Sequence, residues 1–203
     1  MSTTQYQPDD YYERRTSHFA RLKVGDNDII MLGDSLINGC EWHELLNNPH
    51  IRNRGINSDT VEGVRMRIDH VTQGSPKQIF VMVGINDISH NKDAHTIAHE
   101  IIQMADEIHR QSPTTLLYIH SLLPFDASLH YTSLAGKEAT VRDVNTLLQQ
   151  HSSEHKYTYI DIYTHLLASD SECIDLTYTN DGLHLNGNGY ELWGRLLQPY
   201  INE

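Results

Sequence analysis

The chain has 203 residues, 38% of them hydrophobic and 21% charged, which fits one domain with a buried core of its own. The 27 acidic residues outnumber the 15 basic ones and give a net charge of −12, which disfavours nucleic acid as a partner because phosphate backbones repel such a protein. The longest apolar run, 78–85, is far shorter than the ~20 residues that cross a bilayer, so membrane insertion is not expected.

The N-terminal residues and the two cysteines give little information on the compartment of the protein. The first ten residues are polar and contain neither the basic region nor the apolar run of an export signal, so the chain as written is expected in the cytoplasm. A leader removed earlier would leave no trace, and the protein would then be an exported one. Cys40 and Cys173 do not form a Cys-x-x-Cys pair, so they indicate neither zinc nor redox chemistry.

Short apolar segments alternate along the chain with longer segments of helical period, a pattern typical of β-α-β units and a parallel sheet. We therefore predict an α/β fold in one domain. The predicted strands are Asp28–Leu32, Ile51–Arg54, Gln78–Gly84, Thr115–His120 and Tyr157–Ile162. The predicted helices are Asp10–Leu22, Leu36–Asn47, Thr60–Thr72, Ala94–Gln111, Ser133–His151 and Gly189–Tyr200, with a loop at 169–180.

Polar residues follow three of the predicted strands. Ligands of open parallel sheets bind at the carboxyl ends of the strands, so these residues are the first candidates for a site. They are Gly33-Asp34-Ser35, the segment 53–60 and Gly84-Ile85-Asn86-Asp87, and the last loop adds Asp181-Gly182-Leu183-His184.

Ser35 is the candidate nucleophile, since it lies at a predicted strand-to-helix turn. A serine hydroxyl attacks only when a base takes its proton, and such a base needs a carboxylate to orient it. His184 and Asp181, three residues apart, supply both groups. Taken alone, Gly-Asp-Ser is more often a helix N-cap and Asp-Gly-Leu-His a turn, but their occurrence together at the strand ends favours a catalytic site.

These motifs resemble the SGNH, or GDSL-type, hydrolases over residues 29–197, above all the platelet-activating-factor-acetylhydrolase-like and carbohydrate-esterase-like branches. Gly33-Asp34-Ser35-Leu36 matches the first family block, Gly84-Ile85-Asn86-Asp87 the third and Asp181-Gly182-Leu183-His184 the last. The resemblance implies a flavodoxin-like, five-stranded parallel sheet in a three-layer α/β/α sandwich, here with an N-terminal helical extension and occupying 1–203 as a single domain. It implies Ser35 as nucleophile, His184 as general base and Asp181 as orienting acid.

The same resemblance implies an oxyanion hole formed by the Ser35 N–H, the Asn86 side-chain amide and one backbone N–H of the second block. That block departs from the family pattern, because Ser58 stands where a glycine usually gives the N–H. Any residue except proline keeps a backbone N–H, so Ser58 can still donate. Gly55 is the alternative donor if the loop is shifted.

The expected function is metal-independent serine esterase activity, without a cofactor, on small acyl esters such as O-acetyl groups of a carbohydrate or similar polar carrier. Leu36, Ile85 and Leu183 are candidates for a shallow acyl pocket, although leucines at such positions also pack into cores. A lysophospholipase or thioesterase with the same triad is one alternative, and a catalytically inactive binding module is another. The composition leaves open whether copies of the chain associate.

Two pairs of histidines have the i,i+4 spacing of metal ligands on a helix, His95 with His99 and His151 with His155. Neither pair has a third ligand at a recognisable spacing or the glutamate of a His-Glu-x-x-His motif. The sequence therefore predicts no metal site.

Overall fold

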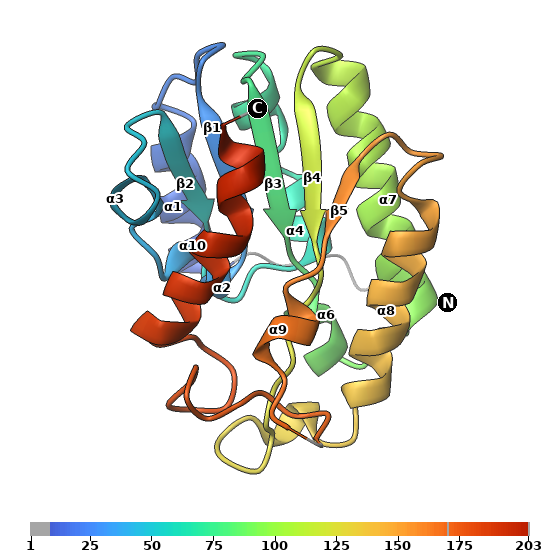
Figure 1. Ribbon diagram of the computed structural model, residues 1–203. Helices are drawn as coiled ribbons and strands as arrows, with labels where there is room; N and C mark the ends of the chain where they lie inside the picture. The colour runs from blue at the N-terminus through green and yellow to red at the C-terminus, as the bar shows by residue number, and fades with distance from the viewer. Residues whose placement is uncertain (1–8, 170, 203) are drawn as a thin grey trace.

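A single five-stranded parallel sheet organises the computed structural model, which describes residues 9–169 and 171–202. Its strands are β1 (Ile29–Gly33), β2 (Ile51–Gly55), β3 (Gln78–Met82), β4 (Leu116–His120) and β5 (Thr158–Ile160), in the order β2-β1-β3-β4-β5. The predicted α/β fold is confirmed. All five strands point toward the same edge of the sheet, the lower one in Figure 1, so their carboxyl ends meet there.

Strand β1 is buried along its whole length and pairs with both β2 and β3. Its last residue, Gly33, lies level with Gly55 of β2 and Met82 of β3. A Cβ atom at Gly33 would lie 2.0 Å from the Met82 carbonyl oxygen, so the close approach of these strands requires glycine.

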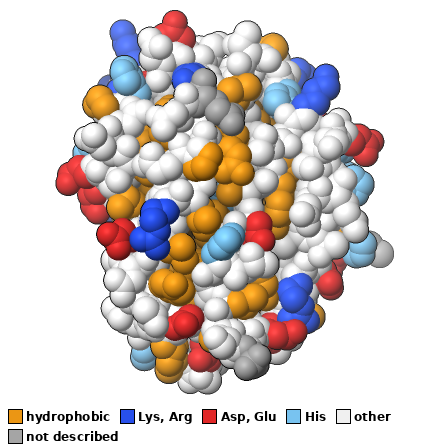
Figure 2. Space-filling view, viewed as in Figure 1, with side chains coloured by type: hydrophobic (Ala, Val, Ile, Leu, Met, Phe, Trp, Pro, Cys, Tyr) orange, Lys and Arg blue, Asp and Glu red, His pale blue; other side chains and the backbone are white. Residues whose placement is uncertain are grey.

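Helices cover both faces of the sheet. On one side α10 contacts α3, and on the other α7 contacts α4, α5 and α8. Figure 1 shows α10 across the near face, and in the same view Figure 2 shows hydrophobic side chains in a band beside it. The helices are α1 (Asp10–Phe19), α2 (Ser35–Asn38), α3 (Trp42–Leu45), α4 (Val61–Arg65), α5 (Asp69–Thr72), α6 (Ile85–Ser89), α7 (Ala94–Gln111), the 3₁₀ turn η1 (Thr132–Leu134), α8 (Glu138–His151), α9 (Tyr163–Leu166) and α10 (Gly187–Ile201).

Two predicted helices are each interrupted. The segment 36–47 divides into α2 and α3, and 60–72 divides into α4 and α5. The predicted helix 133–151 begins only at Glu138, after η1 and Gly136, which has a φ of 73°. The short helices α6 and α9 are not among the predicted elements. Within the described part of the chain, no helix is long and apolar enough to cross a membrane.

Candidate active site

Ser35 is the first residue of α2 and lies directly beyond the carboxyl end of β1. Asp34 caps this helix, since its side chain accepts a hydrogen bond of 3.0 Å from the Leu36 N–H. As the first residue of the helix, Ser35 has a backbone N–H with no acceptor inside that helix. Its side chain is half-buried, so the hydroxyl and this N–H can both meet a ligand.

Asp181, His184 and Ser35 form one chain of hydrogen bonds. Oδ2 of Asp181 lies 2.9 Å from Nδ1 of His184, and Nε2 of His184 lies 3.0 Å from Oγ of Ser35. The other carboxylate oxygen of Asp181 accepts the backbone N–H groups of Leu183 and His184, at 2.9 and 2.8 Å. The structure therefore brings together three residues that are up to 149 positions apart.

The loop before α10 holds the Asp181–His184 pair in a tight turn. Thr179 Oγ donates to the His184 carbonyl at 2.7 Å and accepts the Gly182 N–H at 3.0 Å. Gly182 has a φ of 87°, and a Cβ atom there would lie 2.2 Å from the Asp126 carbonyl oxygen. This turn needs glycine for both its dihedral angle and its space.

Several hydrogen bonds stabilise the ionised form of Asp181. Partial burial opposes it, but hydrogen bonds from the His184 side chain, the Leu183 and His184 backbone and the Tyr131 hydroxyl hold the pKa of Asp181 well below its usual range. An ionised Asp181 favours a proton on Nδ1 of His184, which leaves the Nε2 lone pair facing Ser35. The geometry thus matches a serine activated by histidine.

Tyr131 is a third polar contact of the pair and was not a candidate from the sequence. Its hydroxyl donates to Oδ2 of Asp181 at 3.0 Å and lies 3.0 Å from Nδ1 of His184. Burial, the hydrogen bond and the charge of Asp181 raise the pKa of Tyr131, which keeps its hydroxyl a donor. Tyr131 is 50 residues from Asp181, in the loop between β4 and α8, and no local motif marks it.

The candidate oxyanion donors also lie at this edge. Asn86, in the first turn of α6, donates one amide hydrogen to the Asp59 carbonyl at 2.9 Å and keeps a second one. Ser58 has a φ of 63°, a left-handed conformation that explains why glycine is usual at this position. The N–H of Gly55 donates to Asn53 at 2.8 Å, so Ser58 is the better placed donor of the second block.

Buried charges beneath the site tie its loops together. Arg67 pairs with Asp59 at 2.7 Å and also donates to the Gly33 carbonyl at 3.0 Å. Asp87 accepts the Val61 N–H at 3.0 Å and pairs with Lys92 at 2.7 Å. Because these contacts join the ends of β1 and β3 to the segment 59–61, they fix the relative positions of Ser35, Ser58 and Asn86.

A cavity of about 310 Å³ opens at the hydroxyl of Ser35. Of the expected acyl pocket, Ile85 and Leu183 line this cavity and Leu36 does not. Leu36 is only 2% exposed, because its side chain points into the hydrophobic core at the start of α2. It therefore lies outside the acyl pocket predicted from the sequence. The lining residues are Ser35, Asn57, Ser58, Ile85, Asn86, Ser89, Tyr131, Ser133, Leu134, Leu183 and His184.

The chain is similar over most of its length to a class of ester hydrolases. Residues 31–192 match the GDSL-like lipase/acylhydrolase family, so the chain belongs to that family and is an ester hydrolase. Among curated proteins it is similar to platelet-activating factor acetylhydrolase IB subunit alpha1 of Bos taurus, with 28% identity over 178 residues. That match covers 84% of this chain and 73% of the relative. The Homo sapiens protein of the same name is also 28% identical.

Solved structures share the fold at lower identity. One is a Streptococcus pneumonia protein named for platelet activating factor, with a TM-score of 0.85 and 22% identity, which covers 94% of this chain and 92% of that one. Another is a GDSL-like lipase of Bacteroides thetaiotaomicron, with a TM-score of 0.80 and 20% identity over 94% of this chain and 97% of that one. These matches support the three-layer architecture of the family.

Proposed function

We propose that the protein is a serine esterase that removes small acyl groups, acetyl foremost, from a carbohydrate or similar polar carrier. The observation that carries this proposal is the hydrogen-bond chain from Asp181 through His184 to Ser35, which ends at a cavity of about 310 Å³. The chain has the order and the atoms that nucleophilic catalysis by serine requires.

In the proposed mechanism, Oγ of Ser35 attacks the ester carbonyl while Nε2 of His184 takes the hydroxyl proton. His184 then gives this proton to the departing alcohol, which leaves an acyl group on Ser35. A water molecule, deprotonated by His184, hydrolyses the acyl-enzyme and restores the serine. Asp181 stays ionised throughout and stabilises the charged imidazole, as its low pKa favours.

The oxyanion of each tetrahedral intermediate would be held by the N–H groups of Ser35 and Ser58 and by the side chain of Asn86. The last two residues line the cavity, and Asp59 fixes the Asn86 amide from behind. One donor of this kind contributes ~2.7–4 kcal/mol to transition-state stabilisation, so Asn86→Ala should lower kcat by about 100- to 1000-fold.

The walls of the cavity support a short acyl group and a polar carrier. Ile85, Leu134 and Leu183 give it an apolar side, whereas Asn57, Ser89 and Ser133 are polar. The curated relatives are named as acetylhydrolases, which agrees with an acetyl group as the part removed. An acyl chain that overfills a packed site costs ~1–3 kcal/mol, so acetyl esters should exceed butyryl esters by roughly 5- to 150-fold in kcat/KM.

A panel of acetyl, butyryl and octanoyl esters on sugar and lipid carriers tests this function, with Ser35→Ala as the companion variant. Acetyl sugars should be the best substrates, and Ser35→Ala should lose several powers of ten in kcat while keeping the wild-type circular dichroism. Octanoyl or lysophospholipid esters as the best substrates would replace the proposal with a lysophospholipase, and long acyl thioesters would replace it with a thioesterase.

A further inference from the structure

A second cavity, of about 560 Å³, lies between α7 and α8 and shares no lining residue with the cavity at Ser35. Four histidines line it: His95 and His99 from α7, His151 at the end of α8, and His155 in the turn that follows. Nothing in the proposed ester hydrolysis uses these residues. Imidazoles gathered in one cavity are typical of transition-metal binding.

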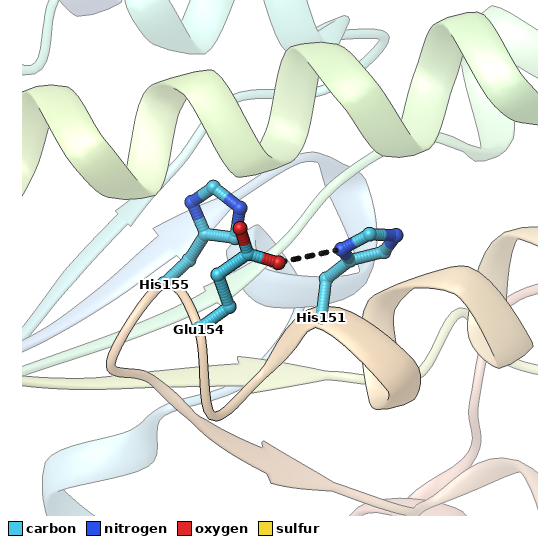
Figure 3. Close-up of side chains that lie close together, drawn as sticks. All are labelled: His151, Glu154 and His155. Atoms are coloured by element: carbon cyan, nitrogen blue, oxygen red, sulfur yellow. Dashed lines mark ion pairs between the residues drawn. The ribbon is translucent and has the colours of Figure 1, made fainter.

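Two of these four histidines, His151 and His155, form a cluster with the neighbouring Glu154. Each offers a ligand atom, and these atoms all lie within 4.8 Å of one another. Nδ1 of His151 lies 3.5 Å from Oε2 of Glu154, and Figure 3 shows the Glu154 carboxylate between the two imidazole rings. In a tetrahedral site, ligand atoms ~2.0–2.2 Å from the ion lie ~3.3–3.6 Å apart, so the exposed side chain of Glu154 would rotate to complete the set.

The backbone after α8 produces this arrangement. The helix ends at His151, and the His155 N–H still donates to the His151 carbonyl at 3.1 Å. That bond keeps the two histidines one turn apart, with 6.0 Å between their ring centroids. The sequence predicts no metal because His151-Ser-Ser-Glu-His155 does not have the spacing of a known metal motif, but in this turn the carboxylate of Glu154 lies beside both histidines.

Asp106 of α7 orients the cluster from the opposite helix. Its two carboxylate oxygens lie 2.9 and 3.1 Å from Nδ1 of His155. A proton held on Nδ1 by this carboxylate leaves the Nε2 lone pair available, which is the arrangement found around most metal-binding histidines. A simple ion pair between His151 and Glu154 would not need a carboxylate from a second helix to orient His155. The contact from Asp106 is therefore the observation that favours a metal site.

We propose that His151, Glu154 and His155 bind a divalent transition-metal ion of the zinc class, with Asp106 as the residue that positions His155. Two imidazoles and one carboxylate suit Zn²⁺, Cu²⁺ and Ni²⁺ rather than Mg²⁺ or Ca²⁺. Because Asp106 belongs to α7, the bound ion also links the end of α8 to its neighbour helix and stabilises the folded chain.

Isothermal titration of the chelator-treated, full-length protein with ZnCl₂ tests the proposal. Wild type should bind one Zn²⁺ at its tightest site, and its Tm should rise with zinc. His151→Ala/His155→Ala should weaken this site by at least ~100-fold, because it removes two ligands, and Asp106→Asn should weaken it by ~10- to 100-fold. His95→Ala/His99→Ala is the matched control, since it removes two imidazoles from the same cavity, and it should retain the wild-type affinity.

Two results would overturn the site: undiminished zinc affinity in His151→Ala/His155→Ala, or an equal loss in the matched control. Electron paramagnetic resonance of the Cu²⁺-loaded protein gives a second test that does not depend on a double variant. Wild type should show hyperfine coupling from two imidazole nitrogens, and His151→Ala from one. Identical spectra of the two proteins would also refute the assignment.

Discussion

Tyr131 contacts both Asp181 and His184 through one hydroxyl group, which makes it the residue most able to adjust the pair. We expect Tyr131→Phe to lower kcat by about tenfold, since a hydrogen bond to a charged group contributes ~1.5–3 kcal/mol and this one is partly exposed to solvent. KM should change little, because the lost contact orients the base rather than the substrate. Steady-state kinetics on an acetyl ester measure both constants.

Ser133→Ala is the matched control for this prediction. Ser133 lines the same cavity and, among the hydrogen bonds of the described residues, has none to Asp181 or His184. Its loss should leave kcat near the wild-type value. A wild-type kcat in Tyr131→Phe would show that Tyr131 only packs against the histidine ring, 5.6 Å away between centroids.

The apolar wall of the cavity should determine which acyl chain lengths the protein accepts. Leu183→Ala should raise the ratio of butyryl to acetyl activity by about 5-fold or more, because it removes the wall that a longer acyl chain would have to displace. Leu36→Ala is the comparison, since Leu36 lies in the core beside Ser35 but outside the cavity. It should lower the free energy of unfolding by ~2–5 kcal/mol without changing this ratio. An unchanged ratio in Leu183→Ala would remove Leu183 from the acyl wall.

Residues within recognisable motifs are the part of the site that the sequence could predict. Ser35, Asp181 and His184 lie in short blocks at strand ends or in the last loop, and the structure brings them to one place. Tyr131 could not be predicted, because its neighbours Asp181 and His184 are distant along the chain. Glu154 stands between His151 and His155 in the sequence, but the order His-Ser-Ser-Glu-His does not match a known metal motif.

The turn that carries Asp181 and His184 depends on Gly182. Gly182→Ala should lower both the urea midpoint and kcat, because the new Cβ would lie 2.2 Å from the Asp126 carbonyl and the φ of 87° is unfavourable for alanine. Gly136 provides the matched control: it has a φ of 73° with nothing within 4 Å of the added Cβ. Gly136→Ala should cost only ~1–2 kcal/mol of stability and keep kcat. Equal effects of the two substitutions would mean that the steric contact at Gly182 is unimportant.

The interrupted helices show where prediction from local sequence stops. Asn53 of β2 donates to the carbonyl oxygens of Ile37, Asn38 and Cys40, at 2.8, 3.2 and 2.9 Å. These hydrogen bonds occupy the carbonyl groups at the end of α2, so the helix stops there. Arg67 turns inward between α4 and α5 to reach Asp59 and the Gly33 carbonyl. Helical periodicity cannot predict such breaks, since the acceptors and donors are distant along the chain. The strands and the long helix α7 depend on apolar patterns alone and were predictable.

At the scale of the whole molecule, buried carboxyl groups should make stability depend on pH. Burial raises the pKa of Asp34 to about 7, whereas an aspartate of the unfolded chain titrates near ~3.9. Between these values the folded state holds a proton that the unfolded state has released. The contribution of Asp34 to stability is therefore complete below about pH 4 and is lost as the pH rises to about 7.

Asp34→Asn should remove this dependence, because an amide stays neutral at every pH. Urea unfolding from about pH 4 to about pH 7 should show wild type losing up to ~4 kcal/mol of stability that Asp34→Asn does not lose. Burial also raises the pKa of Asp59 to about 6, so a residual slope remains in the variant. The same slope in both proteins would show that Asp34 is ionised in the folded state across this range.

The proposed mechanism requires Ser35, activated by His184, to be the nucleophile. Intact-mass spectrometry after reaction with a fluorophosphonate tests it most directly, because the reagent forms a stable bond only with an activated serine. We expect one adduct per chain, located on Ser35 by peptide mapping, with none on the folded Ser35→Ala variant and much slower labelling of His184→Ala. An adduct on another residue, or equal labelling of Ser35→Ala, would contradict it.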